Sequence, residues 1–316
     1  SAASDVYKRQ PKVYLIGAGP GHPCLLTKKA ERCLQKADVI LYDQLVHPFL
    51  LHLSSPETEW IHVGKTPYTK YIKQERINQL IVEKAQTAQT IVRLKGGDPA
   101  IFGRVAEEVE TLRAHHIDYE IVPGITAASA AVSQLGKGLT ERNVSTNITF
   151  TTGHFKNNEE NEIDMTTLEH GGTLAIYMGI KRLPRLMHDI KNKMGIDFPV
   201  AIVFNATHPN QRVISGTVNT IVEQIEMLPE RLGPGVTIVG QVVRDVQTDV
   251  ANTSRNYETV LIRGERLEAI ARAFDYFEAG HQVVIDDRHY SDLHASQIEK
   301  ITQLIQDTTF TQVVDL

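Results

Sequence analysis

Short apolar runs alternate with segments of helical period through the first part of the chain. Runs rich in Val, Ile, Leu and aromatic residues predict five strands: VYLI (13–16), VILY (39–42), EWIHV (59–63), TIVRL (90–94) and YEIVP (119–123). Between them, apolar residues recur at helical spacing, at Ile77, Leu80, Ile81 and Ala85 and again at Ile101, Val105, Val109 and Leu112. Strands that alternate with helices favour βαβ units and a parallel sheet.

The pattern restarts after a junction of small and polar residues, GKGLTERNVSTN (136–147). It predicts five further strands: ITFTTGH (148–154), TLAIYMG (173–179), PVAIVFN (199–205), QRVISGTV (211–218) and GVTIVGQVV (235–243). Only TIVEQIEML separates the last two, which favours a hairpin or a mixed sheet. We therefore predict two α/β domains, at 11–135 and 136–248, with binding sites where they meet and at the carboxyl ends of strands.

The two ends of the chain stand apart from this pattern. Residues 249–316 predict a small C-terminal α/β extension with a strand, a helix, a strand and a helix, which either packs on the second domain or forms an appendage. The first ten residues, SAASDVYKRQ, lack an initiator Met and show no period. We interpret residues 1–10 as a disordered tag or a sequence artefact and leave them out of the fold.

Composition is that of an ordinary water-soluble globular protein. No run is long and apolar enough to cross a bilayer and no secretory signal opens the chain, so we expect a cytoplasmic protein without a membrane partner. The formal net charge of −5 gives no general support to a nucleic-acid partner. Cys24 and Cys33 lack C-x-x-C spacing, so we expect both to be buried as small apolar groups, and we assign no metal ligands.

Three glycine-rich turns each follow a predicted strand. The first, GAGPG (17–21), does not fit the dinucleotide fingerprint G-x-G-x-x-G, because the position of its third glycine is His22. The third, VPGITAA (122–128), opens a helix of small residues that leaves room for a ligand against the backbone. Either turn, taken alone, could equally be a close packing feature with no ligand.

The second turn, KGGDP (95–99), lies between a strand and a helix that we expect to begin near Pro99. Its two glycines allow a ligand to approach the backbone closely. Asp98 can accept hydrogen bonds from a ligand, or it can cap the helix. The residues themselves leave these two interpretations open.

Taken together, the motifs resemble those of the tetrapyrrole methylase family. The resemblance covers about residues 12–246 and rests on GAGPGHPCLLT, LYDQLV, VGK, VRLKGGDPAIFGR, VPGIT, LTER, TGH, MG and NATHPNQRVISGTV. It implies two α/β domains with a cleft between them for S-adenosylmethionine. Within the family, YDxLV and VGK favour the members that methylate uroporphyrinogen III.

The resemblance also implies the residues that bind the methyl donor, S-adenosylmethionine. They come from the three turns and from loops of the second domain: Pro20, Gly96, Gly97, Asp98, Ile101, Thr126, Ala127, Met178 and Ala206. It implies a homodimer that methylates uroporphyrinogen III at C2 and C7 to give precorrin-2, in the sirohaem and cobalamin branch.

The expected substrate is an octacarboxylate, which calls for cationic side chains. Lys65 in VGK and Arg104 in FGR match the family's substrate-side residues best, and Arg142 and Arg212 are further candidates. Asp43 follows the strand VILY and is the candidate base, since a proton must leave the pyrrole system. We expect Asp43, Lys65 and Arg104 to be catalytic. Glu141, where His is common in the family, puts an anion near the expected substrate rim.

Other functions stay open at this point. A sister precorrin methyltransferase would share every motif, and a diphthamide or ribosomal-RNA methylase would share the fold. A non-catalytic adenosylmethionine-binding sensor of tetrapyrroles would keep the glycine turns without needing Asp43. A nicotinamide-dependent dehydrogenase is disfavoured by His22.

Overall fold

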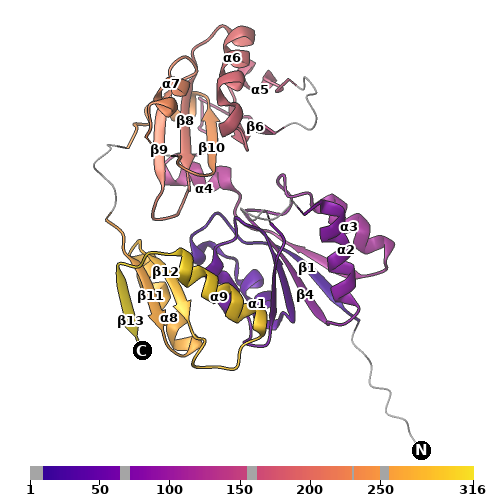
Figure 1. The fold of residues 1–316 in the computed structure, drawn as a ribbon. Helices are drawn as coiled ribbons and strands as arrows, with labels where there is room; N and C mark the ends of the chain where they lie inside the picture. Colours follow the sequence, from indigo (N-terminus) through magenta and orange to yellow (C-terminus); the bar gives the residue numbers. More distant parts are fainter. Residues whose placement is uncertain (1–9, 65–71, 155–161, 230, 250–255) are drawn as a thin grey trace, which may run out of the picture. The chain divides into compact units, whose positions relative to one another are not determined.

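The computed structural model describes residues 10–64, 72–154, 162–229, 231–249 and 256–316. The chain forms two compact units, one made of residues up to Ile125 together with Tyr257–Leu316, the other of Thr126–Asn256 (Figure 1). The sequence placed this division later, between 135 and 136. The difference is the helix α4 (Ala127–Gln134), which packs against the second unit's strand β10 (Gly235–Val239).

The first unit is built on a parallel sheet of five strands, as the βαβ pattern predicted. The strands are β1 (Lys12–Gly17), β2 (Val39–Tyr42), β3 (Glu59–His62), β4 (Thr90–Lys95) and β5 (Asp118–Val122). Their order is β3-β2-β4-β1-β5, so β1 lies between β4 and β5. All five carboxyl ends therefore lie at one edge of the sheet.

Helices cover both faces of this sheet (Figure 1). On one face α2 (Gln74–Ala85) and α3 (Val105–Ala114) pack on the sheet through Ile81 and Leu112. The other face is covered by α1 (Lys28–Lys36), which follows the 3₁₀ turn η1 (Pro23–Leu25), and by the 3₁₀ segment η2 (Pro48–Leu53).

The helix expected near Pro99 begins only at Val105. Residues 99–103 form turns, and Arg104 precedes the helix with a φ of +55°. A left-handed residue interrupts a right-handed helix, so the turn and the helix are separate elements.

The C-terminal segment is part of the first compact unit, where the sequence analysis expected either an appendage or an addition to the second domain. It forms β11 (Thr259–Arg263), α8 (Arg266–Glu278), β12 (Gln282–Asp286), α9 (Ala295–Asp307) and β13 (Gln312–Asp315), a strand that the sequence analysis missed. The sheet is parallel, in the order β12-β11-β13. Phe277 and Ile301 belong to the same hydrophobic core as Phe49 and Trp60. The apolar side chains of the C-terminal segment are therefore buried against η2 and the five-stranded sheet.

A buried arginine fixes the same contact. Arg266 donates to Asp287 over 2.6 Å, to the Ser54 carbonyl over 3.0 Å and to Gln297 over 2.7 Å. Gln297 in turn donates to the Thr58 carbonyl over 2.6 Å. These partners satisfy polar groups that would be costly to bury unpaired, which ties the segment to the first unit.

The second unit contains a mixed sheet in the order β6-β7-β10-β8-β9. Its elements after α4 are β6 (Ile148–Thr152), α5 (Thr166–Glu169), β7 (Thr173–Tyr177), η3 (Ile180–Arg182), α6 (Leu183–Met194), β8 (Pro199–Phe204), β9 (Arg212–Thr217), α7 (Ile221–Glu226), β10 and η4 (Gln241–Val243). The mixed sheet was predicted, but a hairpin of the last two strands was not correct. β9 pairs with β8, because α7 carries the chain over to place β10 between β7 and β8.

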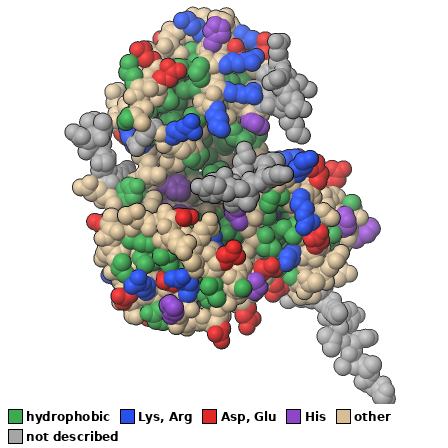
Figure 2. All heavy atoms as spheres, in the orientation of Figure 1, with side chains coloured by type: hydrophobic (Ala, Val, Ile, Leu, Met, Phe, Trp, Pro, Cys, Tyr) green, Lys and Arg blue, Asp and Glu red, His purple; other side chains and the backbone are tan. Residues whose placement is uncertain are grey.

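The cysteines, the helix lengths and the surface charges complete the description of the fold. Cys33 is buried, but Cys24 is exposed, contrary to expectation, because it lies in η1 before the first helix. Among the residues that the structure describes, no helix could span a membrane. On the face of the first unit seen in Figure 2, acidic and basic side chains are interspersed.

Candidate functional site

The three glycine turns of the first unit meet at the carboxyl edge of its sheet. Gly19 N–H donates to the Gly97 carbonyl over 3.1 Å and Gly97 N–H donates to the Gly19 carbonyl over 2.8 Å. A Cβ on Gly17 would lie 2.5 Å from the Gly97 oxygen and 2.7 Å from Gly124 Cα. Here the backbones of three turns pack on one another, so part of the glycine pattern serves this packing.

Asp98 holds the second and third turns together. One carboxylate oxygen accepts from Ala100 N–H over 2.7 Å and the other accepts from Gly124 N–H over 3.4 Å. It therefore closes a turn and does not cap α3. Pro20 and Ile101 are half-buried in the first and second turns.

Gly96 is the glycine that faces away from this packing. The three atoms nearest to a Cβ there would all belong to Leu45, the closest being its Cβ at 3.1 Å. Leu45 is 63% exposed, and Phe102 in the same region is 41% exposed. A bare backbone with exposed apolar neighbours offers a surface on which the face of a flat aromatic ring can lie.

In the second unit the predicted cofactor residues also gather at one sheet edge. β6, β7 and β8 run parallel to one another, so Met178 after β7 and Ala206 after β8 lie at the same edge. Tyr177 brings the start of α4 to it. Its hydroxyl lies 2.6 Å from Thr126 Oγ1 and accepts from Ala128 N–H over 3.1 Å, which also fixes Ala127 between them.

Backbone strain marks this edge. Met178, Asn205 and Thr207 have φ values of 53°, 47° and 72°. Non-glycine residues in this region cost free energy and tend to occur at functional sites. The sequence analysis did not select Tyr177 or Asn205. Their signal was their position directly before Met178 and Ala206, at the ends of two apolar runs.

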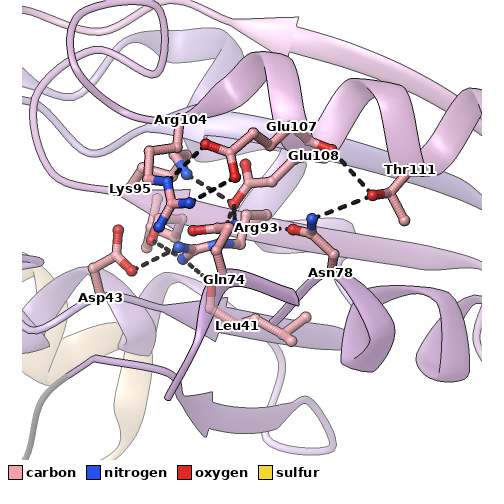
Figure 3. Close-up of polar contacts among 11 residues, drawn as sticks. Leu41, Asp43, Gln74, Asn78, Arg93, Lys95, Arg104, Glu107, Glu108 and Thr111 are labelled. Atoms are coloured by element: carbon pink, nitrogen blue, oxygen red, sulfur yellow. Dashed lines mark hydrogen bonds and ion pairs between the residues drawn. The ribbon is translucent and has the colours of Figure 1, made fainter. Parts of the chain in front are cut away.

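Asp43 belongs to a cluster of charged side chains beneath the carboxyl edge of the first sheet (Figure 3). Its carboxylate accepts from Arg93 Nη2 over 2.7 Å. Arg93 Nε and Lys95 Nζ both donate to Glu108 Oε1, over 3.0 and 2.8 Å. Asp43 is 30% exposed at its side chain, whereas Arg93, Lys95 and Glu108 are buried. We call these four residues the charge cluster.

Burial and pairing act against each other in the charge cluster. Burial disfavours the charge of Arg93, but the Asp43 and Glu108 carboxylates outweigh it and raise the pKa of the guanidinium. Burial lowers the pKa of Lys95, and neighbouring Arg93 lowers it further. The sequence analysis missed Arg93, Lys95 and Glu108. The available signal was a pair of cations in a strand, TIVRLK, that is otherwise apolar.

Arg104 lies directly before α3 and forms two hydrogen bonds with Glu107, of 2.8 and 2.6 Å. The Arg104 guanidinium is therefore already hydrogen-bonded to a carboxylate of this chain. A substrate carboxylate has to displace Glu107 or bind to the guanidinium beside it. Lys65 lies outside the described residues.

The anion at Glu141 is compensated within the second unit. Arg244 donates to both of its carboxylate oxygens, over 2.9 and 2.8 Å. This hydrogen bonding lowers the pKa of Glu141. Arg142 beside it is exposed, and Arg212 opens β9.

Asp43 and the second glycine turn are neighbours. Asp43 N–H donates to the Leu94 carbonyl over 3.2 Å, and Leu45 lies against Gly96. A carboxylate that can take a proton thus lies beside a backbone surface that can hold an apolar ligand. The arrangement suits a group transfer to a carbon that must also lose a proton.

Comparison with known proteins gives a consistent picture. The family model of Tetrapyrrole (Corrin/Porphyrin) Methylases matches residues 12–222. A uroporphyrinogen-III C-methyltransferase of Methanocaldococcus jannaschii is 43% identical over 235 residues, which are 73% of this chain and 96% of that protein. A siroheme synthase of Psychrobacter arcticus is 45% identical over 235 residues, which are 73% of this chain but only 42% of that protein. The chain spans about half the length of the siroheme synthases that it matches.

Solved structures agree. A uroporphyrin-III C-methyl transferase of Thermus thermophilus, complexed with S-adenyl homocysteine, is 35% identical with a TM-score of 0.63 and covers 74% of this chain and 99% of its own. The cobalt precorrin-4 methyltransferase CbiF is 28% identical with a TM-score of 0.64, and the match covers 72% of this chain and 94% of that protein. The segment after β10 lies outside the family match.

Proposed function

The chain belongs to the tetrapyrrole methylase family, and on that basis we propose that it is an S-adenosylmethionine-dependent uroporphyrinogen-III C-methyltransferase. It methylates uroporphyrinogen III at C2 and then C7 to give precorrin-2, in the sirohaem and cobalamin branch. The observation that carries the proposal is the meeting of the three glycine turns beside Asp43 at one sheet edge. Relatives of the same printed name, 42–43% identical, support it.

Binding of the methyl donor is assigned to the two sheet edges described above. In the first unit the assigned residues are Pro20, Gly96, Gly97, Asp98 and Ile101, and in the second unit they are Thr126, Ala127, Met178 and Ala206. S-adenosylmethionine brings a methyl group on a cationic sulfonium, which is already a strong electrophile. The work of the chain is therefore to align this methyl with the pyrrole carbon.

Proton removal is assigned to Asp43. Within the described part of the chain, Arg93 is the one hydrogen-bond partner of its carboxylate, through Oδ1. We assign the proton to Oδ2. Arg104, with Lys65, is assigned to the substrate carboxylates, because a guanidinium fork binds a carboxylate through two hydrogen bonds.

We further propose a cytoplasmic homodimer with no nucleic-acid or membrane partner. The support is the family resemblance, together with the mixed surface charge and the net charge of −5. Light scattering that returned the mass of a single chain would contradict the dimer.

The test is incubation of the purified chain with labelled S-adenosylmethionine and uroporphyrinogen III, followed by product mass. Asp43→Asn keeps the size of the side chain but takes up no proton at neutral pH, so it should lower kcat by roughly 10²–10⁴-fold. Arg104→Lys keeps the charge and loses the fork, so it should mainly raise KM for the tetrapyrrole.

The outcomes separate the rival functions. Turnover of precorrin-2 but not of uroporphyrinogen III would identify a sister methyltransferase. Binding of both ligands without methylation would identify a sensor. Full activity of Asp43→Asn would remove Asp43 from the mechanism and leave catalysis to alignment.

A further inference from the structure

We propose that Arg93 is a positioning residue for the Asp43 carboxylate, and that Glu108 holds the Arg93 guanidinium in the orientation that this requires. The inference rests on the proposed function, which makes Asp43 the proton acceptor. It concerns side chains that the functional assignment above does not use.

The Arg93 guanidinium is fixed on all sides. Nη2 donates to Asp43 Oδ1 over 2.7 Å and Nε donates to Glu108 Oε1 over 3.0 Å. Nη1 lies 3.4 Å from the Leu41 carbonyl oxygen and 3.3 Å from that of Leu94. Main-chain atoms of β2 and β4 thus set the plane of the group, and a side chain only 2% exposed has no room to turn. Asp43 Oδ1 is therefore held at one point.

Glu108 is the hub of the charge cluster. It is 0% exposed, and its Oε1 accepts from Arg93, from Lys95 and, over 3.2 Å, from Gln74 Nε2 (Figure 3). Its Oε2 has no partner among the described residues. Two cations and two carboxylates make the cluster neutral when all are ionised. Asp43 is its only member that reaches solvent, so the cluster presents one carboxylate at the sheet edge.

The position of the cluster in the sheet argues against a role in packing alone. Ile91, Arg93 and Lys95 share one face of β4, where Ile91 lies in the apolar core and the cations lie toward the carboxyl edge. Buried ion pairs add little stability compared with well-packed apolar residues. The charges replace apolar side chains only at the end of the strand where the candidate site lies.

Other titratable groups lie around the charge cluster, and their effect on the pH profile must be told apart from that of Asp43. His62 at the end of β3 has a pKa lowered by burial and by Lys300 of α9, against the opposing effect of Asp43. Arg104 and Glu107 at the start of α3 are paired with each other. Lys65 lies outside the described residues. The experiment therefore needs two variants that change the charge beside Asp43 in opposite directions.

The experiment is the pH profile of kcat for methylation of uroporphyrinogen III by the wild type, Asp43→Asn, Arg93→Gln and Glu108→Gln. In the wild type, kcat should fall as the pH is lowered, and we call this fall the acid limb. It should be absent in Asp43→Asn. Arg93→Gln removes the adjacent cation, so the limb should move to higher pH. Glu108→Gln leaves the cluster with a net positive charge, so the limb should move to lower pH.

Two controls separate positioning from structural damage. Asp287→Asn is the matched variant, because Asp287 is also a fully buried carboxylate that accepts from an arginine Nε, over 2.6 Å, and has one oxygen without a partner in the described chain. It should lower the unfolding temperature without moving the limb. Arg93→Lys keeps the cation but not the fork, so it should restore the limb while kcat stays low.

Opposite limb shifts in Arg93→Gln and Glu108→Gln, with the limb unmoved in Asp287→Asn, support the proposal. An active wild type whose limb stays in place in both cluster variants overturns the positioning role and leaves the proposed function standing. A wild type that methylates no uroporphyrinogen III overturns both. If Arg93→Gln does not fold, the comparison of Glu108→Gln with Asp287→Asn decides. The proposal stands only if the acid limb moves in Glu108→Gln and stays in place in Asp287→Asn.

Discussion

At the scale of single residues, Gly96 and Gly97 show two different uses of glycine. Gly97 has a φ of +66° and pairs with Gly19 through two backbone hydrogen bonds. Gly96 has no positive φ, and the atoms nearest to a Cβ there would belong to Leu45. The sequence alone suggests that both glycines admit a ligand. The backbone conformation argues otherwise for Gly97.

We therefore expect Gly97→Val to destabilise the first unit by about 1–3 kcal/mol, the cost of a β-branched residue in a left-handed conformation. Gly96→Ala should leave the melting temperature nearly unchanged and weaken S-adenosylmethionine binding. Thermal melting and calorimetry measure the two effects. Normal binding by a folded Gly96→Ala variant would show that this turn does not face the ligand.

His52 links stability to pH at the residue scale. It is 2% exposed, lies edge-on to Trp60 at 5.2 Å between ring centroids, and is close to Arg266. Burial, and then the Arg266 charge, lower the pKa of His52 from its ordinary 6.5 to about 3. The unfolded chain therefore binds a proton below about pH 6.5 that the folded chain does not bind.

Stability contributed by neutral His52 is complete above pH 6.5 and declines as the pH falls toward 3. At pH 5 the loss is about 2 kcal/mol, since each pH unit below the unfolded pKa costs about 1.4 kcal/mol. His52→Phe should remove this difference between pH 7 and pH 5. Urea unfolding followed by the fluorescence of Trp60, the single tryptophan, measures it. Replacing the exposed His115 by Ala is the control, and an unchanged pH difference in His52→Phe would contradict the prediction.

At the scale of elements, α8 docks on η1, directly after the first glycine turn, and on η2. Phe277 packs edge-to-face on Phe49 at 4.8 Å and on His47 at 5.4 Å between ring centroids. The Phe277 carbonyl oxygen lies 3.1 Å from His22 Nε2. A helix that lies outside the family match thus supports the turn that opens the family's first motif.

Phe277→Ala should lower the free energy of unfolding by about 3–5 kcal/mol, as for other large-to-small changes in a core. Leu267→Ala on the same helix is the control, because Leu267 is 74% exposed and its loss should cost less than about 0.5 kcal/mol. The Trp60 signal follows both variants in urea. Equal midpoints for Phe277→Ala and the wild type would mean that the segment folds independently of the first sheet.

At the scale of the whole molecule, the chain should bind S-adenosylmethionine and not NAD. A dinucleotide site needs glycine at the third position of its fingerprint so that helix and strand pack closely. Here that position is His22, whose ring also accepts from Cys24 N–H over 3.1 Å and adjoins Phe277. Calorimetry with each ligand checks this, and tight NAD binding without adenosylmethionine binding would end the methylase interpretation.

The sequence by itself determined where the strands other than β13 lie, because burial on one or both faces of a strand is a local pattern. VILY became β2 at Val39–Tyr42, and QERINQLIVEKA became α2. It also determined the three turns, since glycine and proline act on their own backbone dihedrals. The start of α3 was misplaced because Arg104 has a left-handed φ, and an arginine in a sequence does not indicate that conformation.

Only the tertiary structure decided which distant residues meet. Asp43 and Arg93 are 50 positions apart, and Arg266 and the Ser54 carbonyl are 212 positions apart. Nothing local to either partner specifies such a pair, because its free energy depends on burial that both partners create together. The same holds for β10, which enters the sheet between β7 and β8. Periodicity therefore set the elements, whereas long-range packing set the charge cluster and the place of the C-terminal segment.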